Sequence, residues 1–151
     1  MGAAYFYHLT ESPLEATLPT LVEKSRAAGW RVLVRGREPV LLQRLDQVLW
    51  EKPVDSFLPH GMAGGPHDAR QPVLLGVDVV AEGFDCLMSV GGADLTGAEV
   101  GLAERACILF DGADPDAVAH ARTQWKALTG AGCAAQYWAQ DGGRWTKKAE
   151  A

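Results

Sequence analysis

The chain has 151 residues, of which 48% are hydrophobic and 22% are charged, and its formal net charge is −5 at pH 7. This length and apolar content fit one globular domain with a single core. No apolar run approaches the about 20 residues of a membrane span, and the N-terminus lacks a signal-peptide pattern, so we expect a cytoplasmic protein. The acidic balance argues against a primary DNA-binding protein, because such a surface repels a phosphate backbone.

The first elements along the chain are a strand and a helix. Residues 4–9 form a short apolar and aromatic run that predicts a strand. Ser12–Glu15 has the pattern of a helix start, with a capping serine, a proline at the first helical position and a glutamate that can bond back to the cap. Pro19 removes a backbone donor and predicts a kink or a delayed regular helix, and Gly29 predicts its end.

The remaining chain continues this alternation. Residues 30–34 predict a second strand, and residues 38–50 predict a second helix with an apolar face. A final helix is expected over 114–129, followed by a last, edge strand over 134–139. Nearly continuous apolar runs predict further strands that are covered on both faces, at 73–77, 86–90 and 106–110.

This order of elements predicts an α/β fold: a mostly parallel sheet flanked by helices on both sides, Rossmann-like in type. Neither a G-x-G-x-x-G nor a G-x-x-x-x-G-K-[ST] sequence is present, so we expect no nucleotide-binding loop. We divide the chain into a single domain over 1–140 and a basic, flexible tail over 141–151.

The cysteines and histidines show no pattern typical of a metal site or an active site. Cys86, Cys107 and Cys133 are widely spaced among apolar neighbours, which predicts buried thiols. His60 and His67 share one loop, but their spacing fits no standard zinc site. No serine nucleophile motif occurs. We therefore expect no catalytic residue, no metal and no cofactor.

An aromatic segment follows the second predicted helix, where a surface connection would normally be polar. Trp50 lies on the last turn of that helix, and Phe57, Pro59 and His60 follow in a short extended segment. Together with Arg44 they predict a compact partner-binding patch, because aromatic residues dominate interface energies. Two alternatives stay open. Trp50 fills the core, or His60 serves only to hydrogen-bond loop backbone.

A second candidate surface lies on the last predicted helix. Arg122 and Lys126 are four residues apart and flank its inward stripe. A ring beside two cations suits an acidic peptide with an apolar end, because the ring receives the apolar group and the guanidinium takes a carboxylate. The alternative is a solvated basic face over a core tryptophan. The stripe follows 3-4-3 spacing: Val118, Ala121, Trp125 and Leu128.

Several segments resemble one known family. The run 45–53, followed by 56–60, resembles the signature of the chi subunit of the bacterial DNA polymerase III holoenzyme. The opening Phe6-Tyr7, the strand at 29–34 and the late helix around Arg122 fall in that family's order and spacing. The resemblance covers nearly the whole chain, and it implies a small accessory protein of the clamp-loader assembly that makes no covalent bonds.

The resemblance also implies partners and binding residues. In the chi family, the last helix binds the C-terminal tail of single-stranded DNA-binding protein, an acidic peptide that ends in phenylalanine. The family's essential arginine matches Arg122, and its tyrosine three residues later is Trp125 here. The positions of Trp50 and Phe57 match those that bind psi, the partner that ties chi to the clamp loader, or a helicase-like repair partner.

Two positions depart from the family pattern. The lysine one helical turn before the arginine is Val118 here, and an apolar position ahead of the helix is Asp111, whose charge would repel an acidic tail. Lys126, Arg144 or Lys147 are candidates to supply the missing cation.

These observations lead to the hypothesis of a non-catalytic replisome adaptor. The alternative is a small nucleotide- or metabolite-binding enzyme built on a Rossmann-like sheet. A third possibility, direct binding of single-stranded DNA, requires a basic groove with stacked aromatic side chains. The acidic balance argues against strong binding of this kind, and any such binding should vanish at moderate salt.

Overall fold

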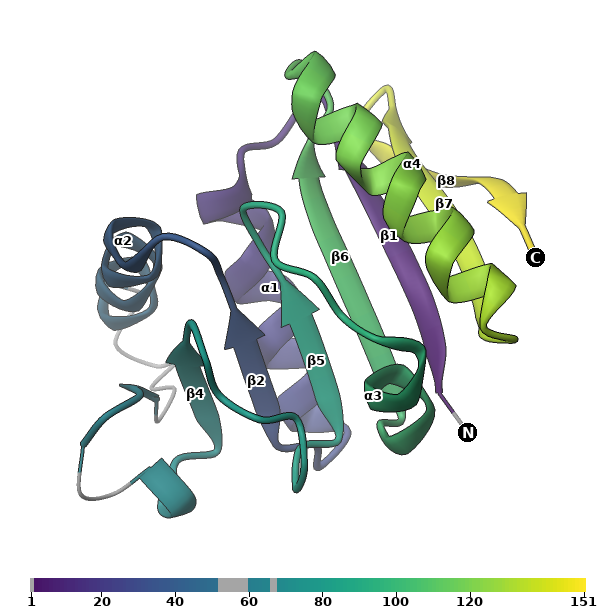
Figure 1. The fold of residues 1–151 in the computed structure, drawn as a ribbon. Helices are drawn as coiled ribbons and strands as arrows, with labels where there is room; N and C mark the ends of the chain where they lie inside the picture. The colour runs from purple at the N-terminus through teal and green to yellow at the C-terminus, as the bar shows by residue number, and fades with distance from the viewer. Residues whose placement is uncertain (1, 52–59, 66–67) are drawn as a thin grey trace.

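Strands and helices alternate along most of the chain in the computed structural model, which describes residues 2–51, 60–65 and 68–151 (Figure 1). The helices are α1 (Leu14–Ala27), α2 (Pro39–Trp50), α3 (Gly97–Leu102) and α4 (Pro115–Gly130), with a 3-10 turn at Asp68–Arg70. The strands are β1 (Ala3–Leu9), β2 (Val32–Arg35), β3 (Gly61–Met62), β4 (Val73–Gly76), β5 (Cys86–Ser89), β6 (Arg105–Asp111), β7 (Ala134–Asp141) and β8 (Arg144–Glu150).

All described strands join one sheet in the order β3-β4-β2-β5-β6-β1-β7-β8. Neighbouring strands are parallel, except that β7 and β8 pair antiparallel. The chain moves toward one edge from β1 to β2, and toward the other edge from β6 to β7. Because parallel crossovers are right-handed, opposite directions of travel put the connecting helices on opposite faces. The predicted α/β fold with helices on both sides is confirmed (Figure 1).

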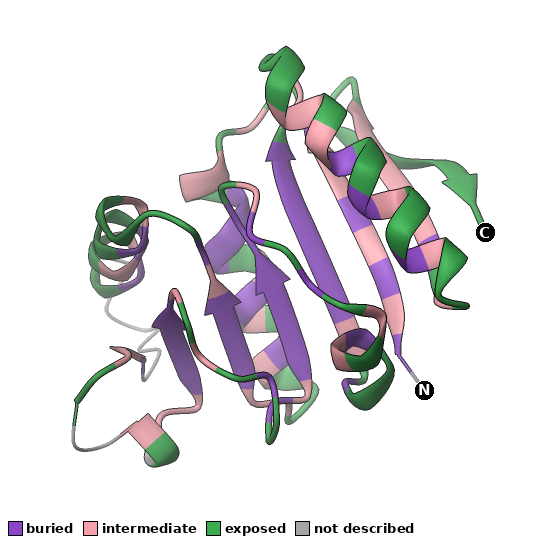
Figure 2. Cartoon of the chain, viewed as in Figure 1, coloured by how far each residue is buried: buried purple, intermediate pink, exposed green. Residues whose placement is uncertain are grey.

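Each face of the sheet has its own apolar core. On the α1 and α2 side, Leu18 and Leu45 pack against Val34, whereas Leu33 points to the α3 and α4 side and joins Leu128. This alternation follows from the period-2 geometry of a strand. The central strands β5 and β6 are buried over nearly their whole length, as predicted for apolar runs that are covered twice (Figure 2).

The predicted start of the first helix is wrong in its detail. The N-cap residue is Pro13, which makes no side-chain capping bond. Instead, the side chain of Gln140 on β7 holds this turn: its amide oxygen accepts hydrogen bonds from the backbone N–H groups of residues 10–12, and its amide nitrogen donates to Ser12 Oγ at 3.0 Å. Pro19 lies inside α1, which begins at Leu14, and Gly29 follows the helix with a φ of 82° as a helix-ending glycine.

Two further elements differ from the expectation. β7 is not an edge strand, because β8 pairs with it over Arg144–Glu150, within the predicted flexible tail. Helix α3 is an unpredicted element, although Thr96 and Glu99 form a capping box at its start. Both misses concern short or exposed segments with little apolar patterning.

The thiols follow the expectation in part. Cys86 and Cys107 are buried, whereas Cys133 is only partly buried, and all three are free. None of the helices in the described ranges is long and apolar enough to cross a membrane.

Candidate functional site

Trp125 lies at the border of the core beneath α4. Its side chain is partly buried, and its ring meets Phe6 of β1 at 5.3 Å and Tyr137 of β7 at 6.1 Å between centroids, both edge to face. Ala121 and Leu128 are each 1% exposed, so the predicted inward stripe is confirmed. Trp125 therefore packs against the core without being enclosed by it.

The two basic residues of α4 are exposed. The side chains of Arg122 and Lys126 form no hydrogen bond or ion pair with other residues that the structure describes. Arg122 lies one helical turn before Trp125 on α4, and the Trp125 ring contacts that of Tyr137. Partial burial raises the pKa of Tyr137, and the positive charge of Arg122 acts against that rise. We define the α4 surface as Val118, Arg122, Trp125, Lys126 and Tyr137.

Sequence reasoning missed Tyr137 and His8. The hydroxyl of Tyr137 lies 2.6 Å from His8 Nδ1, and the His8 ring meets Phe110 at 5.1 Å between centroids. The alternation of side chains along the first and last predicted strands could have identified them. Phe6, His8 and Tyr137 all lie on the face of the sheet that α4 covers. The floor of the α4 surface is thus a set of rings from strands β1, β6 and β7.

Neither of the two positions that depart from the family pattern adds a charge to the α4 surface. Val118 is partly buried against the core, so it presents no charge to the α4 surface. Asp111 Oδ1 accepts a hydrogen bond from the backbone N–H of Ala113 and lines a crevice that includes neither Arg122 nor Trp125. Lys147 is the register partner of Trp138, and directly paired residues share a face, so it lies on the α1 side. Arg144 pairs in register with Asp141, at the turn between β7 and β8. Of the three candidate cations, Lys126 is the one on α4 itself, four residues from Arg122.

A second surface lies on α2, on the opposite face of the sheet (Figure 1). Val40 is 75% exposed and Trp50 is 54% exposed, so Trp50 does not fill the core. Arg44 is also exposed and contacts Glu15 at 3.3 Å. We define the α2 surface as Val40, Arg44 and Trp50. Phe57 and Pro59, which the sequence analysis grouped with Trp50, lie outside the described residues.

His60 lies behind the α2 surface rather than on it. It is 4% exposed, and its Nε2 lies 3.0 Å from the backbone oxygen and 3.2 Å from Oδ1 of Asp46. Since a carbonyl only accepts, Nε2 carries the proton and donates. The His60 ring meets the Trp50 indole at 4.3 Å between centroids. The histidine bonds backbone, but the partner lies in helix α2 and not in a loop as the alternative held, and the ring also contacts the exposed tryptophan.

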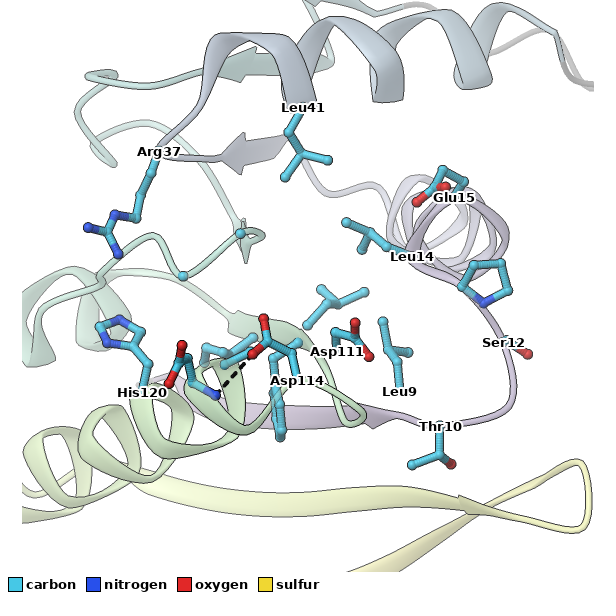
Figure 3. Close-up of a pocket in the computed structure, with 18 of the residues that line it drawn as sticks. Leu9, Thr10, Ser12, Leu14, Glu15, Arg37, Leu41, Asp111, Asp114 and His120 are labelled. Atoms are coloured by element: carbon cyan, nitrogen blue, oxygen red, sulfur yellow. Dashed lines mark hydrogen bonds between the residues drawn. The ribbon is translucent and has the colours of Figure 1, made fainter.

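A crevice of about 730 Å³ opens where β1 and β6 end (Figure 3). At this point the chain passes from β1 to α1 on one face of the sheet and from β6 to α4 on the other. Ligands of α/β proteins commonly bind between two such neighbouring strands. Acidic side chains dominate its charge, and Arg37 and His120 are the basic residue and the histidine in its lining. No cluster of three or more His, Cys, Asp or Glu within the described ranges could hold a metal ion. The acidic residues that line the crevice are Glu11, Glu15, Asp111, Asp114 and Asp116.

This crevice is poorly suited to a phosphate. The Asp114 side chain already accepts a hydrogen bond from the backbone N–H of Asp116 at 3.0 Å, so it caps the N-terminus of α4 where an anion would otherwise bind (Figure 3). Surrounding carboxylates add repulsion. The geometry therefore gives no support to a nucleotide-binding enzyme.

The family model described as DNA polymerase III chi subunit, HolC, matches residues 1–136. The match includes both the α2 surface and α4, and it ends before β8. A search among curated proteins gave no significant match.

Proposed function

We propose that this chain, which belongs to the DNA polymerase III chi subunit family, is an adaptor. It would bind an acidic protein tail on its α4 surface. The family is that of a polymerase accessory subunit. The proposed ligand is the C-terminal tail of single-stranded DNA-binding protein, which the family resemblance implies. The observation that carries the proposal is the exposed Arg122, one helical turn from Trp125, whose partly buried ring contacts that of Tyr137.

The chemistry of the α4 surface fits such a tail. A guanidinium without a carboxylate partner in the described chain can bind the terminal carboxylate in a forked pair. The rings of Trp125 and Tyr137 supply an apolar contact for the phenylalanine side chain. Lys126 adds a second positive charge for the acidic residues of the tail. If Arg122 and Trp125 are hot spots, each contributes about 2 kcal/mol, or roughly thirtyfold in affinity.

The α2 surface supports a second docking interaction, for psi or an equivalent such as a helicase-like partner. Trp50 is the exposed aromatic anchor that interfaces favour, and its contact with His60 restrains the ring before binding. Because α2 and α4 cover opposite faces, both partners can bind at once. A protein with this arrangement would tether the polymerase complex to coated single-stranded DNA without chemistry of its own.

Titration with a fluorescent acidic tail peptide tests the proposal. Arg122→Ala should weaken binding by roughly thirtyfold. Arg44→Ala is the matched control, since it removes an exposed arginine from the other face, and Trp50→Ala should likewise leave tail binding intact. Equal loss in the Arg122 and Arg44 variants, or loss in neither, would contradict the assignment of the tail to α4.

The enzyme alternative makes a different prediction. A nucleotide or metal ion that binds the folded protein at a hundred times its dissociation constant should stabilise it by about 2.7 kcal/mol. We expect no thermal shift with a nucleotide, because the acidic crevice disfavours phosphates. We expect none with a metal ion either, because no group of three or more His, Cys, Asp or Glu in the described ranges could hold one. A clear shift with one nucleotide would favour the enzyme over the adaptor.

A further inference from the structure

A second groove, of about 640 Å³, lies on the face opposite the α4 surface. It runs between α1 and the part of the sheet formed by β1, β6, β7 and β8. On this face α1 packs against β2, β6 and α2, so that the strands toward the β8 edge remain accessible beside it. The groove is lined by aromatic side chains from four segments of the chain: Tyr5, Tyr7, Trp30, Trp138 and Trp145.

The charge of this groove is opposite to that of the whole chain. Lys24 and Arg105 are the charged side chains among the described residues that line it, and no carboxylate does. The chain as a whole carries −5. The acidic crevice lies at the far end of α1, beyond Ser12, where Glu11 and Glu15 belong to its lining. Positive charge is therefore concentrated at the Lys24 end of the groove.

Arg105 is held in position by rings rather than by acids. Its guanidinium lies 4.3 Å from the centroid of Tyr5 and 5.2 Å from that of Trp30. With the other residues in the described ranges the side chain forms no hydrogen bond and no ion pair. Its N–H donors are thus oriented by two cation–π contacts and stay available to a bound anion.

We propose that this groove binds a short stretch of single-stranded nucleic acid. Bases stack on aromatic side chains regardless of sequence, and a neighbouring basic cluster follows the backbone. Here Trp138 and Trp145 provide ring surfaces, while Arg105 and Lys24 provide two phosphate contacts at one end. The exposed hydroxyl of Thr20 on α1 adds a donor of the kind that binds phosphates or sugars.

The succession of rings favours nucleic acid over an acidic peptide. A nucleic-acid strand presents a flat base at every unit, so it can use several rings along one groove. An acidic peptide uses the cations but leaves most of this aromatic lining without a partner. The negative charge of the rest of the chain keeps the binding weak and sensitive to salt, which agrees with the expectation that strong nucleic-acid binding is absent.

Fluorescence anisotropy of a labelled oligothymidylate at low salt tests the inference. Wild type should bind, and binding should weaken steeply as salt is added. Lys24→Gln should weaken binding by about threefold and reduce the salt slope by about 0.7, the value for one phosphate of a single strand. Lys126→Gln, the same change on the opposite face, is the matched control and should have no effect.

Trp138→Leu tests stacking separately from charge. It should weaken binding by at least about fivefold, the lower range for loss of one stacked base. Trp50→Leu is its matched control. Retention of acidic-tail binding by the Trp138 variant shows that it is folded and leaves the two proposals independent. Failure of the tail peptide to bind wild type would remove the adaptor proposal without affecting this one.

Three results would overturn the inference. One is an absence of oligothymidylate binding to wild type at low salt. Another is an equal loss in Lys24→Gln and Lys126→Gln. The third is displacement of the oligonucleotide by an acidic peptide whose own binding is lost in Lys24→Gln, because the groove would then be a peptide site.

Discussion

The α4 and α2 surfaces each present a tryptophan and an arginine on a helix, but the two tryptophans have different surroundings. Trp125 contacts both Phe6 and Tyr137, and α4 packs across β6, β1 and β7, which are interior strands of the sheet. Trp50 is 54% exposed and rests on His60, on a helix that packs against β3 and β4 at the sheet edge. The tryptophan of the α4 surface is thus both part of the core and part of a surface, whereas the tryptophan of the α2 surface belongs to the surface alone.

The largest effect that separates the two sites is on stability. Trp125→Ala removes ring contacts with the core and should lower the free energy of unfolding by about 3 kcal/mol. Trp50→Ala removes a half-exposed ring and should cost under about 1 kcal/mol. Urea unfolding followed by circular dichroism measures both. Equal losses would show that the two tryptophans do not differ in the way their burial indicates.

The sequence predicted the core face of α4 well because local spacing is sufficient for it. The 3-4-3 stripe places Ala121 and Leu128 inside whatever the helix packs against, and both are buried. The start of α1 depends on Gln140, which is far away in sequence but adjacent across the sheet. No local pattern identifies such a partner, and the local serine cap was predicted in its place.

The candidate sites were predictable only in part for the same reason. Trp50 and Trp125 both follow helical spacing, so that the sequence left open which of them fills the core. The exposure of Trp50 depends on its position near the sheet edge, which is a property of the topology. Tyr137 and the groove around Arg105 were missed because their neighbours come from strands that are distant in sequence.

An ion pair on each face of the sheet sharpens the comparison further. Arg35 binds both carboxylate oxygens of Glu99, at 2.9 and 2.7 Å, and the Arg35 side chain is 12% exposed. Arg44 contacts Glu15 at 3.3 Å with 66% exposure of the arginine side chain. Glu99→Gln should lower the free energy of unfolding by about 1.5 kcal/mol, and Glu15→Gln by under about 0.5 kcal/mol.

The same pair predicts a pH dependence. The Arg35 guanidinium, followed by the backbone N–H of Thr96, holds the pKa of Glu99 below its usual value of 4.5. A lowered folded-state pKa gives stability that is present above the unfolded-state value and is lost as the pH falls. Wild type and Glu99→Gln should therefore differ at neutral pH and converge as the pH falls below 4.5. A constant difference across that range would contradict the role of the Glu99 charge.

The hydrogen bond beneath the α4 surface has a smaller expected effect. Tyr137→Phe keeps the ring that packs against Trp125 but removes the hydroxyl that lies 2.6 Å from His8 Nδ1. The free energy of unfolding should fall by about 1 kcal/mol, the typical net value of one hydrogen bond. Affinity for an acidic tail should change less than twofold, because the aromatic ring, which phenylalanine keeps, and Arg122 make the proposed contacts with the tail. A loss as large as that of Arg122→Ala would show instead that the hydroxyl itself contacts the tail.

The smallest effect concerns Lys126. It is the other basic residue of the α4 surface beside Arg122, because this chain has Val118 where the family has a lysine. An exposed charge at the rim of an interface acts mainly on the association rate and the salt dependence. Lys126→Gln should therefore weaken tail binding by only about threefold at low salt, and the difference should disappear near 1 M salt, where the Debye length is about 3 Å. Lys148→Gln is the matched control, since Lys148 pairs with Asp141 on the β8 hairpin. A threefold loss that persisted at high salt would mean that Lys126 is enclosed by the bound peptide, as a hot spot is, and not at its rim.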